Sequence, residues 1–383
     1  MLNIAIRPQR LVFAALMLFA LAVPATAQTI DTAGRQALLV DFDTGTVLLE
    51  KNADELMPPS SMSKLMTAYL VFEKLKEGKL KMTDMLPVTE RAWRKQGSKM
   101  FVALGSQVKV EDLLRGVIVQ SGNDACIVLA EGIAGSEEAF AEMATKRARE
   151  LGLNQSVFKN ATGWPDPGHV MTARDLSVLA RRIITDFPDY YHIYSELNFT
   201  YNGIKQGNRN PLLYKNIGAD GLKTGHTEAA GYGLTASVKR GDRRLILVIN
   251  GLNSMNQRSD ETERLIEWGF REFENYTLVE AGQPITEAEV WLGETATVPL
   301  VPANKAVATL PRAARKDMKV TAIYDGPVAA PIAKGQQVGK LVVTAPSLKQ
   351  PQEIPLIAGA DVPRLGFFGR VMASAKHLVL GGS

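Results

Sequence analysis

The segment DGLKTGHTEAAGYGLTAS, residues 220–237, specifies both a sheet and a chemical site. Its second half, from Tyr232, is typical of a β-strand, and the following KRGDRR is typical of a turn into a second strand, LILVIN. Its first half places a lysine, a threonine, a histidine and two glycines at the edge of that otherwise apolar sheet. A strand needs no such cluster for folding, so the sequence indicates that this edge has a chemical task.

Helical patterns fill most of the chain before this pair of strands. A strand pair at 37–42 and 46–52 precedes a nearly all-apolar helix over 57–79, which should therefore be buried. Further helices are predicted at 111–120, 124–134, 136–152 and 172–187, with Ser136 as one N-cap and a Thr172/Asp175 capping pattern at another. One more helix is predicted at 261–276. Strands at both ends with helices between them predict an α+β domain with an antiparallel sheet over residues 28–277.

Three further segments flank this domain. Residues 1–27 have two arginines, a short apolar run at 11–23 and a small-x-small site ending at Ala27, which predicts a cleaved signal peptide rather than a membrane span. Residues 278–361 are rich in Val, Pro, Thr and Gly, which predicts a small all-β domain. The tail, 362–383, predicts an amphipathic helix with basic residues opposite its apolar side. We expect it to anchor the protein on a membrane surface, and the alternative is a helix docked on its own domain.

Composition excludes several classes of protein. The chain has 383 residues, 46% hydrophobic and 22% charged, and a net charge of only +4, which does not favour a nucleic-acid partner. Its single cysteine, Cys126, excludes an internal disulfide and offers too few ligands for a cysteine metal site. We therefore predict neither a metal nor another cofactor.

A candidate nucleophile and base begin the buried helix. Ser61 and Lys64 are three residues apart and so share one helical face, and burial would lower the pKa of the lysine until it can act as a base. A second cation, Lys223, would act in the same direction. The Ser-x-x-Lys pattern also occurs at 106–109 and 156–159, but in polar or irregular stretches. Context therefore favours Ser61.

A second polar element, Ser121-Gly122-Asn123, separates two predicted helices. A glycine-kinked loop at this point can direct a hydroxyl and an amide into a cleft. On its own, the same tripeptide would be interpreted as a plain helix-breaking turn.

Taken in order, SMSK, SGN and KTG resemble the motif set of the penicillin-recognising serine enzymes. With SGNDAC and GLKTGHT as they stand, the chain most resembles the D-alanyl-D-alanine carboxypeptidases, the low-molecular-mass penicillin-binding proteins, over essentially its whole mature length. The resemblance implies a β-lactamase-like catalytic domain. It also implies a serine-type carboxypeptidase that removes the terminal D-alanine from peptidoglycan stem pentapeptides through an acyl-enzyme. Such an enzyme would be covalently inhibited by β-lactams and exported to the periplasmic face of the inner membrane.

The resemblance also implies roles for individual residues. Ser61 would be the nucleophile, Lys64 its general base, and Ser121 a proton relay toward the leaving amine. The substrate would be bound by the amide of Asn123, by the KTG strand and by cations near its carboxylate, which makes the candidate binding residues Asn123, Lys223, Thr224, Gly225, His226 and Arg209. Gly225 would let the substrate approach the strand, and the backbone N–H groups of Ser61 and His226 would form the oxyanion hole. Arg258 is a weaker candidate cation, and both arginines could equally be surface or fold-supporting residues.

Two features bear on competing interpretations. The loop FKNATGWPDPGHVMTARD offers Asp166 and Asp175 but no glutamate to activate a deacylating water, so an efficient β-lactamase is not predicted. Asp175 is better explained as part of a helix cap, and Cys126 as a buried helix residue. An endopeptidase that cuts cross-links with the same site remains open, as does a non-catalytic membrane scaffold, which the intact motif set argues against.

Overall fold

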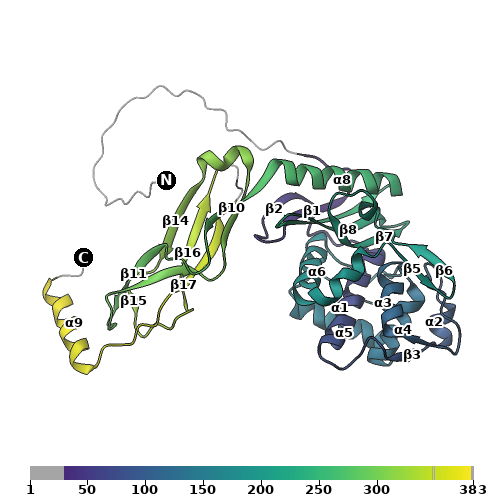
Figure 1. Cartoon of the computed structure of the whole chain (residues 1–383), viewed down its shortest axis with the longest axis horizontal. Coiled ribbons are helices and arrows are strands. Elements are labelled where there is room, and N and C mark those ends of the chain that lie inside the picture. Colours follow the sequence, from purple (N-terminus) through teal and green to yellow (C-terminus); the bar gives the residue numbers. More distant parts are fainter. Residues whose placement is uncertain (1–29, 347, 349, 381–383) are drawn as a thin grey trace, which may run out of the picture.

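The computed structural model describes residues 30–346, 348 and 350–380. The predicted signal peptide, 1–27, lies outside the described residues. The chain forms two parts arranged along one long axis, with the helix-rich part at one end and a β-rich part and a terminal helix at the other (Figure 1).

A five-stranded antiparallel sheet organises the helix-rich part. Its strand order is β2-β1-β9-β8-β7, with β1 Gln36–Asp41, β2 Val47–Lys51, β7 Ala219–Thr227, β8 Gly231–Arg240 and β9 Arg243–Leu252. Lys223 pairs with Thr235 and His226 with Tyr232. The KTG segment therefore forms strand β7, at the edge of the sheet.

Helices cover both faces of this sheet (Figure 1). A 3₁₀ turn, η1 Ser60–Ser63, leads into α1 Lys64–Lys76, which packs with α3 Val110–Ile118, α4 Asn123–Ala134, α5 Glu137–Glu150 and α6 Ala173–Asp186. The opposite face carries α8 Met255–Glu272. Because side chains of a strand alternate between faces, Leu38 joins the core around α1, whereas Leu39 joins the core under α8.

Shorter elements complete this part. They are β3 Met85–Pro87 with β4 Gln107–Lys109, β5 Asn198–Tyr201 with β6 Ile204–Gly207, α2 Glu90–Arg94, α7 Pro188–Tyr191, η2 His192–Ser195 and η3 Pro211–Tyr214. The sequence did not predict these short hairpins, because strands of three or four residues leave almost no periodic signal.

The second part is all β, as predicted. Its six-stranded sheet has the order β14-β16-β17-β12-β11-β15 and packs around an apolar core that includes Leu300, Leu341 and Leu356. The strands are β11 Thr286–Trp291, β12 Thr297–Pro302, β14 Lys319–Tyr324, β15 Val328–Ala329, β16 Gln337–Thr344 and β17 Gln352–Ala358. A two-stranded sheet, β10 Phe273–Val279 with β13 Ala306–Pro311, lies beside it, and η4 Arg312–Asp317 follows β13.

Several helix boundaries differ from the sequence prediction; α8, expected from residue 261, already begins at Met255, and α1, expected to reach residue 79, ends at Lys76. The helix expected at 261–276 ends at Glu272, because Phe273 onward pairs with β13 and the Phe273 ring packs against Trp268. This is tertiary pairing overriding a helical pattern. The helix expected from 57 begins at Lys64, after the 3₁₀ turn. Both predicted N-caps are confirmed, since Ser136 Oγ accepts from Ala139 N and Thr172 Oγ1 accepts from Asp175 N.

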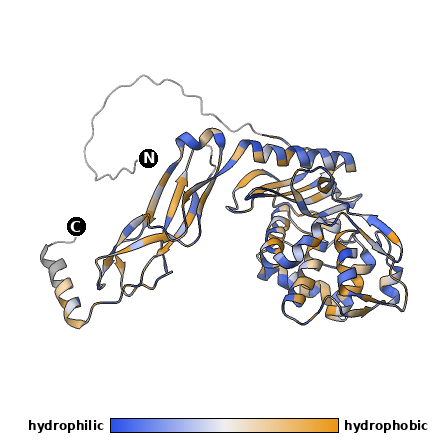
Figure 2. Ribbon diagram, in the orientation of Figure 1, coloured by the Kyte–Doolittle hydropathy of each residue, from blue (hydrophilic) through white to orange (hydrophobic). Residues whose placement is uncertain are grey.

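The tail forms the helix α9 Phe367–Leu380 at the end of the molecule farthest from α1–α6 (Figure 1). Its first turns are coloured toward the hydrophobic end of the scale in Figure 2, and Phe367 and Phe368 are 66% and 83% exposed. Among the residues that the structure describes, no helix is long and apolar enough to cross a membrane.

Candidate active site

Ser61 and Lys64 meet where η1 passes into α1. Lys64 is the first residue of α1 and is 1% exposed, whereas Ser61 is only partly buried. The Lys64 Nζ atom donates to Ser61 Oγ at 2.8 Å and to the Thr162 carbonyl oxygen at 2.5 Å. The predicted pair is therefore in direct contact, with the hydroxyl reachable from the solvent side and the amine enclosed.

The site is electrostatically positive. The pKa of Lys64 is lowered to about 8, mainly by burial; Cys126 and Asp124 act to raise it, and the cations Arg209 and Lys95 add to the lowering. Burial also holds the pKa of Lys223 well below its usual value, with Lys64 and Arg209 adding to the effect. Several basic side chains lie close together here, and each makes it less favourable for the others to be protonated. A site of this kind attracts an anion.

The second motif lies between α3 and α4. Ser121 is buried and has a positive φ of 62°, which turns the chain sharply before Asn123, the first residue of α4. Asn123 holds the neighbouring loop, because its N–H donates to Ser98 O at 2.7 Å and its Nδ2 donates to Gln96 O at 2.8 Å. The amide therefore faces a loop of the site rather than a helix interior.

The third motif lines the edge strand β7. Lys223 and Thr224 are buried, and Lys223 Nζ donates to Thr224 O at 3.2 Å. A Cβ added at Gly225 would lie 3.0 Å from Pro59 O and 3.1 Å from Met62 Cγ. The glycine therefore lets β7 approach the segment that carries Ser61, which is a packing reason that the sequence did not suggest.

Two arginines and a histidine lie around this edge. Arg209 Nη1 donates to Ser98 Oγ at 2.5 Å, on the loop that Asn123 holds. The His226 ring stacks on Tyr232 with centroids 3.9 Å apart, and the Arg258 guanidinium lies 5.7 Å from the Tyr232 ring centroid. Arg258 is buried and its Nε has no hydrogen-bond partner among the described residues, and burial lowers its pKa to about 10.

Asp166, in the loop before α6, and Asp175, in the first turn of α6, are both engaged elsewhere. Asp175 Oδ2 accepts from Ser156 Oγ at 2.7 Å and from Gln155 N at 3.0 Å, while Asp166 Oδ1 accepts from Gly168 N. The Asp175 carboxylate therefore joins α6 to the segment after α5, while its backbone N–H makes the predicted cap bond to Thr172, and the Asp166 carboxylate stabilises the loop.

Sequence reasoning missed the residues that hold this arrangement. Asp124 is fully buried and accepts from Met100 N, Phe101 N and Val102 N, which fixes the loop facing Ser121. Asn160 Oδ1 accepts from the N–H groups of Thr162, Gly163 and Trp164. Of these two residues, only Asn160 has a recognisable sequence signal, because an asparagine in a glycine-containing loop is typical of a turn.

Comparison with known proteins places the fold and the motifs in a family. Residues 23–254 match the family described as D-alanyl-D-alanine carboxypeptidase, and residues 273–364 match the penicillin-binding protein 5 C-terminal domain. The chain belongs to the D-alanyl-D-alanine carboxypeptidase family. The predicted family, its fold and its enzyme class are thus confirmed.

Individual carboxypeptidases are similar over nearly the whole chain. The Escherichia coli D-alanyl-D-alanine carboxypeptidase DacC is 41% identical over 367 residues, which cover 93% of this chain and 92% of the relative. The structure of penicillin-binding protein 5 from Haemophilus influenzae is 39% identical, with a TM-score of 0.82, and covers 88% of this chain and 99% of its own. Penicillin-binding protein D2 from Listeria monocytogenes in its ampicillin-bound form is 30% identical, with a TM-score of 0.58 over 63% of this chain and 99% of its own.

Proposed function

We propose that this carboxypeptidase removes the terminal D-alanine of peptidoglycan stem peptides through an acyl-enzyme on Ser61. The contact between Lys64 Nζ and Ser61 Oγ is the observation that carries the proposal, because it joins a reachable hydroxyl to a buried amine whose pKa is lowered to about 8. A buried lysine of this kind can exist as the neutral amine near physiological pH and remove the proton of the hydroxyl.

In the acylation step, Ser61 Oγ forms a bond to the carbonyl carbon of the penultimate D-alanine. Lys64 Nζ takes the hydroxyl proton, and the amide C–N bond then breaks. The leaving D-alanine amine receives a proton, for which Ser121 is the relay between Lys64 and the amine. Water later hydrolyses the ester, so that the shortened peptide leaves and the serine is restored.

Binding groups surround the reacting carbonyl in this proposal. The backbone N–H groups of Ser61 and His226 hold its oxygen as negative charge develops there. Asn123 binds the peptide backbone of the substrate. The terminal carboxylate is attracted by Lys223, Thr224 and Arg209, and its negative charge favours the ammonium form of Lys223 on binding.

The test uses two substrates and two serine variants. The enzyme should release D-alanine from a synthetic pentapeptide and should be labelled covalently by a fluorescent penicillin. Ser61→Ala should lose both activities with an unchanged unfolding temperature, whereas Ser106→Ala, from another Ser-x-x-Lys segment, should keep both. Labelling that persists in Ser61→Ala would refute the assignment. Faster cleavage of a cross-linked dimer than of the pentapeptide would favour an endopeptidase instead.

We further propose that the enzyme is exported and works at the periplasmic face of the inner membrane, held there peripherally by α9. Support comes from the exposed apolar residues Phe367, Phe368, Val371 and Met372 at the start of the helix. Such residues can enter a lipid interface while basic residues of the same segment attract anionic headgroups.

A further inference from the structure

We propose that Glu137 is a positioning residue for the base, acting through the loop 160–163 whose Thr162 carbonyl receives the Lys64 amine. This inference rests on the proposed function. Glu137 belongs to none of the three motifs and lies in the first turn of α5, where an acidic residue needs no reason beyond the helix dipole. Its surroundings in the fold give it another task.

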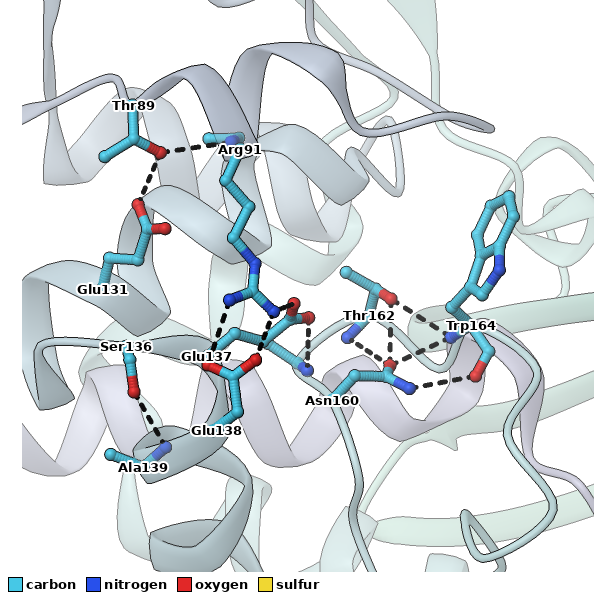
Figure 3. A network of polar contacts seen from close by, with 12 residues as sticks. Thr89, Arg91, Glu131, Ser136, Glu137, Glu138, Ala139, Asn160, Thr162 and Trp164 are labelled. Carbon is cyan, nitrogen blue, oxygen red and sulfur yellow. Dashed lines mark hydrogen bonds and ion pairs between the residues drawn. The ribbon is translucent and has the colours of Figure 1, made fainter.

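Glu137 is a buried carboxylate with two partners. Its side chain is 4% exposed, and its Oε2 pairs with Arg91 at 2.8 Å (Figure 3). Its Oε1 accepts from the backbone N–H of Ala161 at 3.1 Å. Glu138, the next residue, also pairs with Arg91 but is 65% exposed. The two glutamates therefore share a cation, and within the described part of the chain Glu137, not Glu138, bonds to the loop.

The peptide groups beside Thr162 are fixed from two helices. Ala161 N donates to Glu137 of α5, and Ala161 O accepts from Thr67 Oγ1 of α1 at 2.7 Å. Thr67 lies one turn after Lys64 on the same helix. These two bonds fix the peptide groups on either side of residue 161, and so limit the directions in which the next carbonyl, that of Thr162, can point; the Gly163 N–H of that same peptide group donates to Asn160 Oδ1.

The rest of the loop has little freedom to compensate. Asn160 Oδ1 accepts from three successive N–H groups, those of residues 162–164. Asn160 Nδ2 donates to Trp164 O at 3.0 Å (Figure 3). Gly163 has a positive φ of 75°, and a Cβ there would lie 1.9 Å from Ser60 O. The loop is therefore packed directly against the residue that precedes the nucleophile.

The Thr162 carbonyl has a specific effect on the base. In the neutral amine of Lys64, one N–H donated to this carbonyl turns the nitrogen lone pair toward Ser61 Oγ. The same carbonyl stabilises the ammonium form, since its oxygen accepts from the charged group. Releasing the carbonyl should therefore misdirect the base and also lower the pKa of Lys64.

The experiment measures the second-order rate constant for acylation by a penicillin as a function of pH. The concentration of active enzyme is determined from the amount of Ser61 that is labelled when the reaction is complete. Glu137→Ala should lower the maximal rate constant, reached at high pH, by about 10- to 100-fold, which is the loss that a displacement of a catalytic group by about 1 Å causes. It should also move the midpoint of the pH profile to lower pH. Glu137→Gln keeps an oxygen acceptor and should retain the wild-type midpoint. Glu138→Ala is the matched control and should leave both quantities unchanged.

Unfolding temperatures identify a variant that fails to fold. If Glu137→Ala fails to fold, Thr67→Val provides the same test, because it removes the hydrogen bond to the carbonyl oxygen of Ala161. Equal profiles for Glu137→Ala and Glu138→Ala would overturn the proposal, as would a loss in Glu137→Gln equal to that in Glu137→Ala. Absence of Ser61 labelling in the unaltered enzyme would instead contradict the proposed function.

Discussion

The pH dependence of acylation tests the role of Lys64 most directly. The reacting form is the neutral amine, so the rate must rise with pH as Lys64 loses its proton. Because burial and nearby cations lower the pKa of Lys64 to about 8, we expect the second-order rate constant for penicillin acylation to reach half of its maximum near that pH. The pH dependence of this rate constant reports the pKa of the base in the free enzyme.

The size of the effect follows from the position of the pKa. With a pKa of about 8, roughly a tenth of Lys64 is neutral at pH 7 and roughly nine tenths at pH 9, so the rate should rise about tenfold between them. An ordinary lysine, with a pKa near 10.4, would supply about 200-fold less neutral amine at pH 7. Burial in the helix start therefore accounts for most of the activity available at neutral pH.

The assay is stopped-flow acylation at sub-saturating penicillin from pH 6 to pH 10. Arg209→Gln removes a cation that lowers the pKa of Lys64, so its midpoint should move to higher pH. Arg271→Gln, an exposed arginine paired with Glu272 at the end of α8, is the control and should keep the wild-type midpoint. A profile that is flat across this range, or a midpoint at or above pH 10, would refute the neutral-lysine mechanism.

Four further outcomes follow from the same geometry. Lys64→Arg, whose guanidinium stays protonated, should acylate more slowly by at least the roughly 10²–10⁴-fold of a lost general base, and near-normal labelling would contradict this. The penicillin adduct on Ser61 should persist in time-resolved mass spectrometry while a peptide adduct clears, and equally fast turnover would point to Asp166 as an unrecognised base. Gly163→Ala should cost about 1–3 kcal/mol of stability in denaturant unfolding, because of its positive φ and the contact with Ser60 O; an unchanged midpoint would disprove the packing argument. Removal of residues 366–383 should abolish sedimentation with anionic vesicles and leave D-alanine release intact, and continued sedimentation would place the anchor elsewhere.

The sequence predicted those features that depend on local chemistry. Ser136 and Thr172 were identified as caps because a side-chain oxygen before a helix satisfies free N–H groups, and both do so. The strands on either side of Gly241 were predicted from two strand-like segments joined by the turn segment KRGDRR, and they pair as β8 and β9. Ser61 and Lys64 were paired by their spacing and by their place at the start of a buried helix, and their atoms are in contact.

What the sequence could not predict depends on partners distant in the chain. Glu137 looks like any acid in a first helical turn, and its burial and its contact with Ala161, 24 residues away, distinguish it from Glu138. Phe273 continues a helical pattern until β13 offers it a strand partner. Asp124 appeared as an ordinary residue after a motif, although its carboxylate holds three backbone N–H groups of another loop.

The 3₁₀ turn at Ser60–Ser63 explains why the nucleophile and the base are three residues apart. Three residues advance an α-helix by about 300°, which leaves two side chains offset by about 60°, whereas in a 3₁₀ turn they eclipse. Ser60, with a positive φ of 50°, begins this turn. The same spacing at 106–109 runs into strand β4, and at 156–159 it runs through a loop, so neither aligns its serine with its lysine along one axis. A Ser-x-x-Lys motif therefore depends on the angular alignment of its two side chains, and a search of structures that also required a 3₁₀ turn beginning with a positive-φ residue just before the serine would discard the chance matches that spacing alone admits.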